Sequence, residues 1–180
     1  MSEVRLIIIT GAPGTGKTTL ARELARSLVA PLIAKDTIKE ALLDQLGARD
    51  AAESRRLSDA SFAALFALAR EQLAAGVSVL VEGNFRVAEH AAVLRALLTS
   101  PGMRVRIAQV LCELPESARH ARLAARARDP ARHSGHRDAQ LAAAGAPAGA
   151  WLELPGERFA HDGAASAALI AALQRWWRAP

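Results

Sequence analysis

Apolar residues along this chain follow two different periods, and the two periods alternate. Short runs in which nearly every residue is apolar are typical of strands buried in a sheet. Residues 4–9, with the sequence Val-Arg-Leu-Ile-Ile-Ile, form the clearest of these runs. The predicted strands are 4–9, 31–35, 77–82, 104–111 and 158–161, the last of them at an edge of the sheet.

The longer segments repeat apolar residues every three or four positions, which predicts helices. Polar residues at 47–56 and 132–137 are predicted as connections, and Pro101-Gly102 as a turn. The predicted helices are 19–28, 36–43, 57–75, 87–98, 115–128, 138–144 and 164–177.

Strands that alternate with helices favour right-handed crossovers and a parallel sheet with helices on both faces, which is an α/β fold. The 180 residues fit one domain, 1–180, in three α/β/α layers. Ligands of such sheets bind beyond the carboxyl ends of the strands. We therefore expect the chemistry of this protein at that edge of the sheet.

The glycine-rich segment after the first predicted strand is a complete phosphate-binding loop. Backbone N–H groups in such a loop surround the phosphates of a nucleoside triphosphate, and the following helix directs the positive end of its dipole at them. Lys17 is expected to reach the β- and γ-phosphates, and the Thr18 hydroxyl to bind Mg²⁺. The residues predicted to bind the nucleotide here are Gly11, Ala12, Pro13, Gly14, Thr15, Gly16, Lys17, Thr18 and Thr19.

Asp36 follows the second predicted strand, and two interpretations of it are open. Phosphoryl transfer to a hydroxyl needs a group that accepts or orients the hydroxyl proton, and Asp36 is the candidate for this role. Asp36 or Thr37 could instead cap the helix that begins here.

Glu82, Asn84 and Arg86 lie at and after the end of the third predicted strand. Glu82 is the candidate for organising the metal ion with Thr18, since phosphate-loop enzymes place an acidic residue at such a strand end. Asn84 and Arg86 are predicted to touch the acceptor substrate. The alternative is an ordinary solvated loop.

Arginines recur on one face of the helix predicted at 115–128, at Arg119, Arg122 and Arg126. Such a row suits triphosphate binding, although a solvated basic face is the ordinary alternative. His133 and His136 follow three residues apart, but no cysteine or further histidine lies near them in the sequence, so a zinc site is not expected.

The net charge of +5 changes this picture little. The basic residues are almost all arginines spread along the chain, with Lys17, Lys35 and Lys39 as the only lysines. No apolar run approaches the roughly 18 residues of a membrane span, and no leader is recognised. With the single Cys112, predicted as a buried inert thiol, these features favour a cytoplasmic protein without a membrane partner.

Together these motifs resemble the small P-loop kinases of the AAA_33-type group, which includes the kinase domain of polynucleotide kinases and chloramphenicol phosphotransferase. The resemblance is specific at 11–18, at Lys35-Asp36-Thr37-Ile38-Lys39 and at 119–136. It implies a P-loop NTPase fold with a five-stranded parallel sheet and a helical lid at about 116–137. It further implies that Asp36 is the general base and that Arg126 contacts the donor phosphates. Arg122, from the same arginine row, is assigned to nucleotide binding with it. Lys39, in the second motif, is assigned to acceptor binding.

The resulting hypothesis is an ATP- and Mg²⁺-dependent kinase that phosphorylates a hydroxyl of a small molecule or of a nucleic-acid 5′ end. Nucleic acid is possible but not favoured, because few aromatic residues are present to stack on bases. A GTPase is disfavoured because no Asn-Lys-x-Asp segment occurs. The alternative is a nucleotide-dependent switch that acts on a protein partner, and either could be a monomer or a homodimer.

Overall fold

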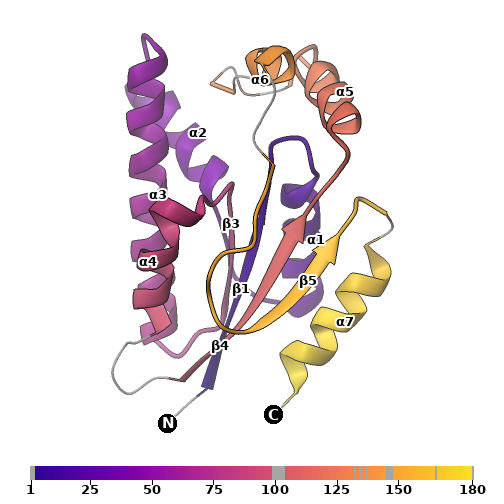
Figure 1. Ribbon diagram of the computed structural model, residues 1–180. Coiled ribbons are helices and arrows are strands. Elements are labelled where there is room, and N and C mark those ends of the chain that lie inside the picture. The colour runs from indigo at the N-terminus through magenta and orange to yellow at the C-terminus, as the bar shows by residue number, and fades with distance from the viewer. Residues whose placement is uncertain are drawn as a thin grey trace.

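The fold is a five-stranded, wholly parallel sheet between two layers of helices, as the sequence predicts (Figure 1). The computed structural model describes residues 3–98, 104–131, 133, 135–136, 138–144, 148–164 and 166–179. The strands are β1 (Glu3–Gly11), β2 (Leu32–Ala34), β3 (Val79–Glu82), β4 (Arg104–Cys112) and β5 (Glu157–His161). They lie in the order β2-β3-β1-β4-β5, so β1 is central and has β3 and β4 as its neighbours.

The two faces of the sheet are covered by different helices because side chains alternate along each strand. Val4, Leu6 and Ile8 of β1 pack against α3 (Ala51–Ala74) and α4 (Val87–Leu98). Ile7 and Ile9 pack on the opposite side against α1 (Lys17–Leu28) and α7 (Ala167–Arg178). A nearly continuous apolar strand thus supplies both cores.

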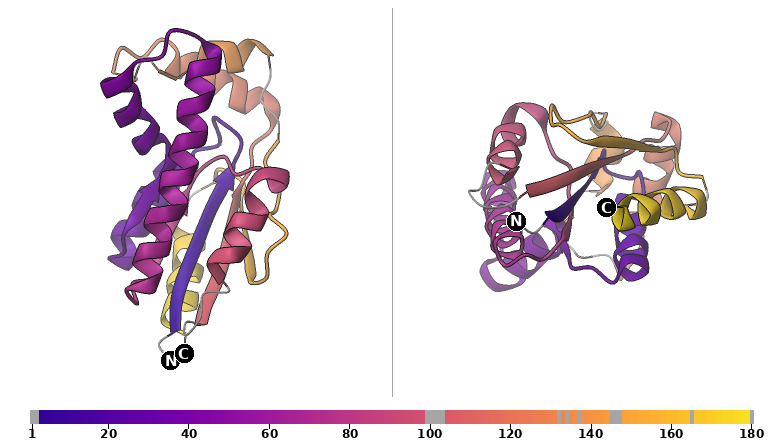
Figure 2. Two further views of the ribbon diagram at one scale, coloured as in Figure 1. Left: turned by 90° about the vertical axis from the view of Figure 1, so that its left-hand side faces the viewer. Right: turned by 90° about the horizontal axis from the view of Figure 1, so that it is seen from below.

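The remaining helices lie beyond the carboxyl ends of the strands. There α2 (Lys35–Leu46) follows β2, and α5 (Glu116–Arg126) and α6 (Asp138–Ala144) lie together over the loop after β1 (Figures 1 and 2). Both chain ends lie at the opposite end of the sheet. The predicted lid at 116–137 therefore begins in α5, and its residues 132, 134 and 137 fall outside the described part.

Several predicted boundaries were wrong. The segment 47–56 was predicted as a connection, but α3 begins at Ala51, where Asp50 caps it by accepting a hydrogen bond of 2.8 Å from the Glu53 N–H. Most residues in the first turns of this helix, its arginines included, are exposed. Apolar residues therefore do not recur there at helical spacing, and the sequence gives no signal for a helix. Helix α7 begins at Ala167 rather than at 164, and α5 ends at Arg126 rather than at 128. The predicted turn at 101–102 lies outside the described residues.

Cys112 is buried, as predicted, and burial is the chief reason that the pKa of its thiol is raised to about 12. Trp176 is buried against α1 and Trp177 is half-buried there, whereas Leu68 of α3 is 48% exposed. Within the described residues, no helix is long and apolar enough to cross a membrane.

Candidate active site

The loop between β1 and α1 has the backbone that its glycines allow. Gly14 and Gly16 adopt φ angles of 85° and 91°, a left-handed conformation that other residues rarely accept. A Cβ at Gly14 would also stand 3.0 Å from the carbonyl oxygen of Arg119 in α5. The Thr15 hydroxyl donates 2.8 Å to the Ala12 carbonyl and so ties the loop together from inside.

The first N–H groups of α1 face this loop without a side-chain cap. Gly16 is the N-cap and has no side chain to accept their hydrogen bonds. The first turn of a helix has N–H groups with no partner inside the helix, and these groups with the helix dipole attract anions. The loop therefore fits the phosphates of a nucleotide.

Sheet register brings the acidic strand ends to the lysine of this loop. Glu82, the last residue of β3, is paired with Ile9 of β1 and with Ala34 of β2. Its Oε1 lies 4.0 Å from Nζ of Lys17. Because Asp36 comes two residues after Ala34, one edge of the sheet gathers Lys17, Glu82 and Asp36.

Glu82 is a buried carboxylate beside Lys17 and Thr18. The residue is 1% exposed, and neither carboxylate oxygen makes a hydrogen bond of regular geometry with a described residue, but the Lys17 ammonium and the Thr18 hydroxyl both stabilise its charged form. Burial raises the pKa of Glu82, the Lys17 ammonium opposes this rise, and the Asp36 carboxylate adds to it. A carboxylate and the Thr18 hydroxyl are oxygen donors of the kind that Mg²⁺ prefers, so this pair fits the ion.

Asp36 has the opposite electrostatic surroundings. Its partial burial would raise the pKa of the carboxyl, but the ammonium groups of Lys35 and Lys17 outweigh this cost. Lys35 also donates a hydrogen bond of 3.1 Å to Oδ1 of Asp36, and the pKa of Asp36 is lowered overall. Asp36 is therefore a stable anion at neutral pH. The N-cap of α2 is Ala34 and not Asp36 or Thr37, so the capping interpretation was wrong.

A cavity of about 420 Å³ joins these groups between the loop, α2, the start of α3 and the lid. Eight of the residues predicted for the site line it: Pro13, Lys17, Thr18, Thr19, Asp36, Lys39, Asn84 and Arg126. Glu82 lies beneath the lining, against Lys17. The cavity thus contains the predicted donor and acceptor groups together.

Arg86 and Arg122 are among the predicted residues that do not line the cavity. Arg86 forms ion pairs of 2.5 Å with Glu89 and 3.8 Å with Asp59, on the outer side of α3 and α4. Arg122 is exposed, and its Nη1 lies close to the phosphate loop: a Cβ added at Gly16 would be 3.4 Å from it. Its guanidinium therefore lies on the outer side of the loop.

Sequence reasoning missed several cavity residues. Lys35, Glu40, Ser58, Asp129 and Asp138 also line the cavity. Asp129 lies within the predicted lid segment and Asp138 directly follows it, and their proximity to the arginine row at 119–126 was the available sequence signal. Ser58 lies at the start of the helix predicted at 57–75, and a lone serine there carries no functional signal in the sequence.

The lid contacts α2 through its two histidines. His133 lies 2.9 Å from Oδ1 of Asp44 and His136 lies 2.5 Å from Oε1 of Glu40. The two histidines, three residues apart in the lid, thus pair with two acidic residues that are four apart, on adjacent turns of α2. These pairs position the lid over the cavity, and the described residues contain no cluster of three or more metal-binding side chains.

Comparison with known proteins agrees with this architecture. The profile of the AAA_33 family, described as an AAA domain, matches residues 6–147. A solved structure of a candidate kinase from Chloroflexus aurantiacus is 32% identical, with a TM-score of 0.84, and the match covers 99% of this chain and 98% of that one. The adenosine phosphosulfate (APS) kinase of Mycobacterium tuberculosis, in complex with AMPPNP and APS, shares the fold at 20% identity and a TM-score of 0.60, over 94% and 95% of the two chains.

One curated relative is the cytidylate kinase of Pyrobaculum neutrophilum, which is 38% identical over 82 residues. That match covers 44% of each protein, so this chain spans less than half the length of the curated relative.

Proposed function

This chain belongs to the AAA_33 family, and from that membership we propose that it is an ATP-dependent phosphotransferase that moves the γ-phosphate to a hydroxyl group. The acceptor hydroxyl belongs to a small molecule or to a nucleic-acid 5′ end. Support comes from a cavity in which a phosphate loop, a lid arginine and an ionised aspartate meet.

The donor side consists of the loop, Lys17 and Arg126. The N–H groups at the start of α1 bind the phosphates, and Lys17 neutralises charge on them. Arg126, at the end of α5, approaches from the lid and stabilises charge that develops during transfer. Mg²⁺, held by Thr18 and Glu82, would supply further charge neutralisation.

The assignment of a hydroxyl acceptor depends on the position and charge of Asp36. Its carboxylate lines the cavity and is held ionised by Lys35 and Lys17. An aspartate anion can accept a hydrogen bond from a hydroxyl, orient its oxygen for attack on the γ-phosphate and take the proton as transfer proceeds. Lys39 and Asn84 line the same cavity and are proposed to contact the acceptor.

A phosphate group is the second candidate acceptor, and the match to a cytidylate kinase favours it. A nucleoside monophosphate carries no proton that must be removed at neutral pH, and its charge would be repelled by Asp36. A hydroxyl acceptor therefore requires the Asp36 carboxylate, whereas a phosphate acceptor does not require it and is repelled by its charge.

The test is ADP release from Mg-ATP over a panel of acceptors: 5′-hydroxyl oligonucleotides, nucleosides, sugars, aminoglycosides, chloramphenicol-like alcohols and nucleoside monophosphates. We expect one hydroxyl class to stimulate the wild-type protein, with a phosphorylated product. Asp36→Asn should reduce kcat about 100-fold or more and leave ATP affinity within about twofold. Asp59→Asn, on the exposed side of α3, is the control and should retain full activity.

Stimulation by monophosphates, with Asp36→Asn active, would replace the hydroxyl assignment with a phosphate acceptor. If no acceptor stimulates ADP release but a protein partner does, the chain is a nucleotide-dependent switch instead. Equal loss of ATP binding and turnover in Asp36→Asn would assign Asp36 a structural role.

A further inference from the structure

Lys35 is buried at a position where local physics disfavours a lysine. The residue is 5% exposed, and removing an ammonium group from water is costly. It is also the first residue of α2, where the positive end of the helix dipole repels a cation. A residue that breaks two local rules at once is expected where function demands it.

The contacts of Lys35 hold its ammonium on one side of Asp36. Nζ lies 3.1 Å from Oδ1 of Asp36 and 5.7 Å from the ring centroid of Phe62 in α3. Behind it is Gly83, where an added Cβ would lie 3.3 Å from the Lys35 Cβ and 3.2 Å from the Phe62 ring. The lysine is thus packed on one side by α3 and the loop after β3, and its ammonium is held beside Asp36.

Asp36 is bound at only one of its two oxygens. Oδ1 accepts from Lys35, whereas Oδ2 makes no hydrogen bond within the described part of the chain. The side chain remains 35% exposed, toward the cavity that it lines. A carboxylate held in this way presents one oxygen in a defined direction.

We propose that Lys35 is a positioning residue for phosphoryl transfer: its buried ammonium holds Oδ1 of Asp36 so that Oδ2 is available to the acceptor hydroxyl. This inference rests on the proposed function and adds to it a residue outside the phosphate loop and the lid. Because Lys35 touches Asp36 and not the nucleotide loop, its loss should affect turnover more than ATP binding.

The experiment compares Lys35→Met, which keeps the apolar stem without the charge, with Lys35→Arg and with Arg70→Met, a matched loss of charge on the exposed face of α3. Lys35→Met should lower kcat about 10- to 100-fold with KM for ATP within about twofold. Lys35→Arg should recover most of the activity, and Arg70→Met should equal wild type. In crystal structures, the Asp36 carboxylate of Lys35→Met should turn from its wild-type direction while the α2 backbone stays in place.

An unchanged kcat, or an unmoved Asp36 carboxylate in Lys35→Met, would overturn the proposal. So would an Lys35→Arg variant as inactive as Lys35→Met but with full thermal stability. If Lys35→Met does not fold, Lys35→Gln replaces it under the same criteria. If the wild type transfers phosphate to no acceptor, the proposed function fails, and the position of the Asp36 carboxylate still tests the contact with Lys35.

Discussion

Asp36 and Glu82 lie at one edge of the sheet, but their surroundings shift the pKa values of the two carboxyls in opposite directions. Asp36 is partly exposed and has two lysines near it, so the pKa of its carboxyl is lowered. Glu82 is fully buried, and burial outweighs the nearby Lys17, so the pKa of its carboxyl is raised. Such a separation is typical of sites in which two carboxylates have different roles. A proton acceptor at the surface and a metal-binding group beneath it fit that division.

The lowered pKa of Asp36 predicts the acidic side of the pH profile. The carboxyl ionises below its usual value of 3.8, so it is already charged at every pH above about 5. We expect Asp36 to contribute no acidic limb to kcat/KM for the acceptor as pH falls from about 8 to about 5. The profile measured by initial rates checks this. If the wild-type profile had an acidic limb near neutral pH, and the limb moved in Asp36→Glu, the low pKa of Asp36 would be contradicted.

Glu82 predicts a specific metal defect. Glu82→Gln keeps the shape but removes the charge of the buried carboxylate that lies against Lys17. We expect the Mg²⁺ concentration for half-maximal turnover to rise about 10- to 100-fold. ATP binding without Mg²⁺, measured by calorimetry, should change little because Lys17 and the loop remain. A Glu82→Gln variant with the Mg²⁺ dependence of wild type would remove Glu82 from the metal site.

At the scale of elements, the start of α4 depends on a buried histidine. Nδ1 of His90 accepts a hydrogen bond of 2.9 Å from the Arg86 N–H. The ring lies 4.0 Å from that of Phe62, and Phe66 and Phe85 complete the cluster between α3 and α4. Burial lowers the pKa of His90, with Arg86 adding to the effect, so the ring is neutral in the folded protein at neutral pH.

This histidine makes stability depend on pH in a known direction. The unfolded chain takes up a proton near pH 6.5 and the folded chain only at lower pH, so stability is lost as pH falls through 6.5. We expect His90→Phe to cost about 1 kcal/mol at pH 7.5, because the Arg86 N–H loses its acceptor. Urea unfolding at pH 7.5 and 5.5 should show a smaller decline for His90→Phe than for wild type. Parallel declines would show that His90 does not titrate differently in the two states.

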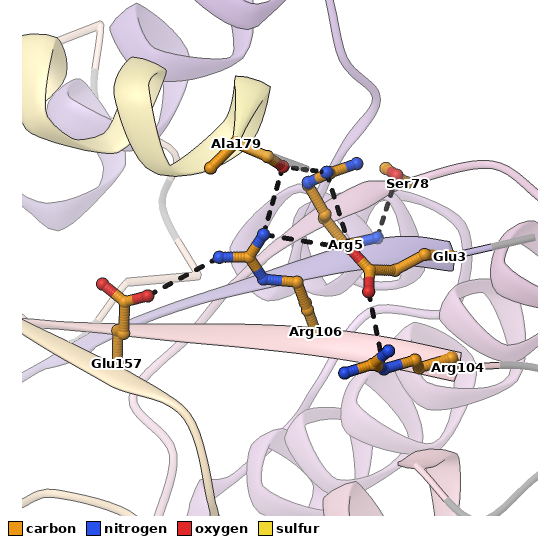
Figure 3. A network of polar contacts seen from close by, with 7 residues as sticks. All are labelled: Glu3, Arg5, Ser78, Arg104, Arg106, Glu157 and Ala179. Carbon is orange, nitrogen blue, oxygen red and sulfur yellow. Dashed lines mark hydrogen bonds and ion pairs between the residues drawn. The ribbon is translucent and has the colours of Figure 1, made fainter.

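At the scale of the whole molecule, a polar network opposite the active site joins the two ends of the chain (Figure 3). The carbonyl of Ala179, after α7, accepts hydrogen bonds of 2.6 Å from Arg5 and 3.1 Å from Arg106. Arg106 also lies 3.7 Å from Glu157 and stacks 5.3 Å from the Trp176 ring centroid. The guanidinium of one β4 residue thus connects α7 and β5 to the centre of the sheet.

Arg104 and Arg106 form a matched pair for measuring this network. Arg106 has a side chain only 25% exposed, whereas that of Arg104 is 77% exposed and forms an ion pair with Glu3. Arg106→Met should lower the free energy of unfolding by about 1–2 kcal/mol, since it removes a hydrogen bond and a cation–π contact. Arg104→Met should change it by less than about 0.5 kcal/mol. Chemical denaturation measures both, and equal effects would show that α7 is held by its apolar face alone.

The sequence by itself determined the features that depend on neighbouring residues. The phosphate loop was predicted because its glycines, Lys17 and Thr18 are contiguous, and the sheet because each strand is a local apolar run. Strand ends could be assigned to one edge because parallel strands share a direction, which brought Asp36, Glu82 and Asn84 into the prediction. The sequence pattern also gave a wrong boundary at the start of α3. Its polar composition predicted a connection, but capping by Asp50 starts the helix at Ala51.

Only the tertiary structure determined the features that depend on which elements are neighbours. The order β2-β3-β1 places Glu82 against Lys17, and the packing of α3 on β2 buries Lys35 beside Asp36. Contacts between elements also hold Arg86 among acids outside the cavity and pair His133 and His136 with α2. Burial and long-range pairing set the cost and the partner of each charge, and neither is encoded in the spacing of residues along the chain.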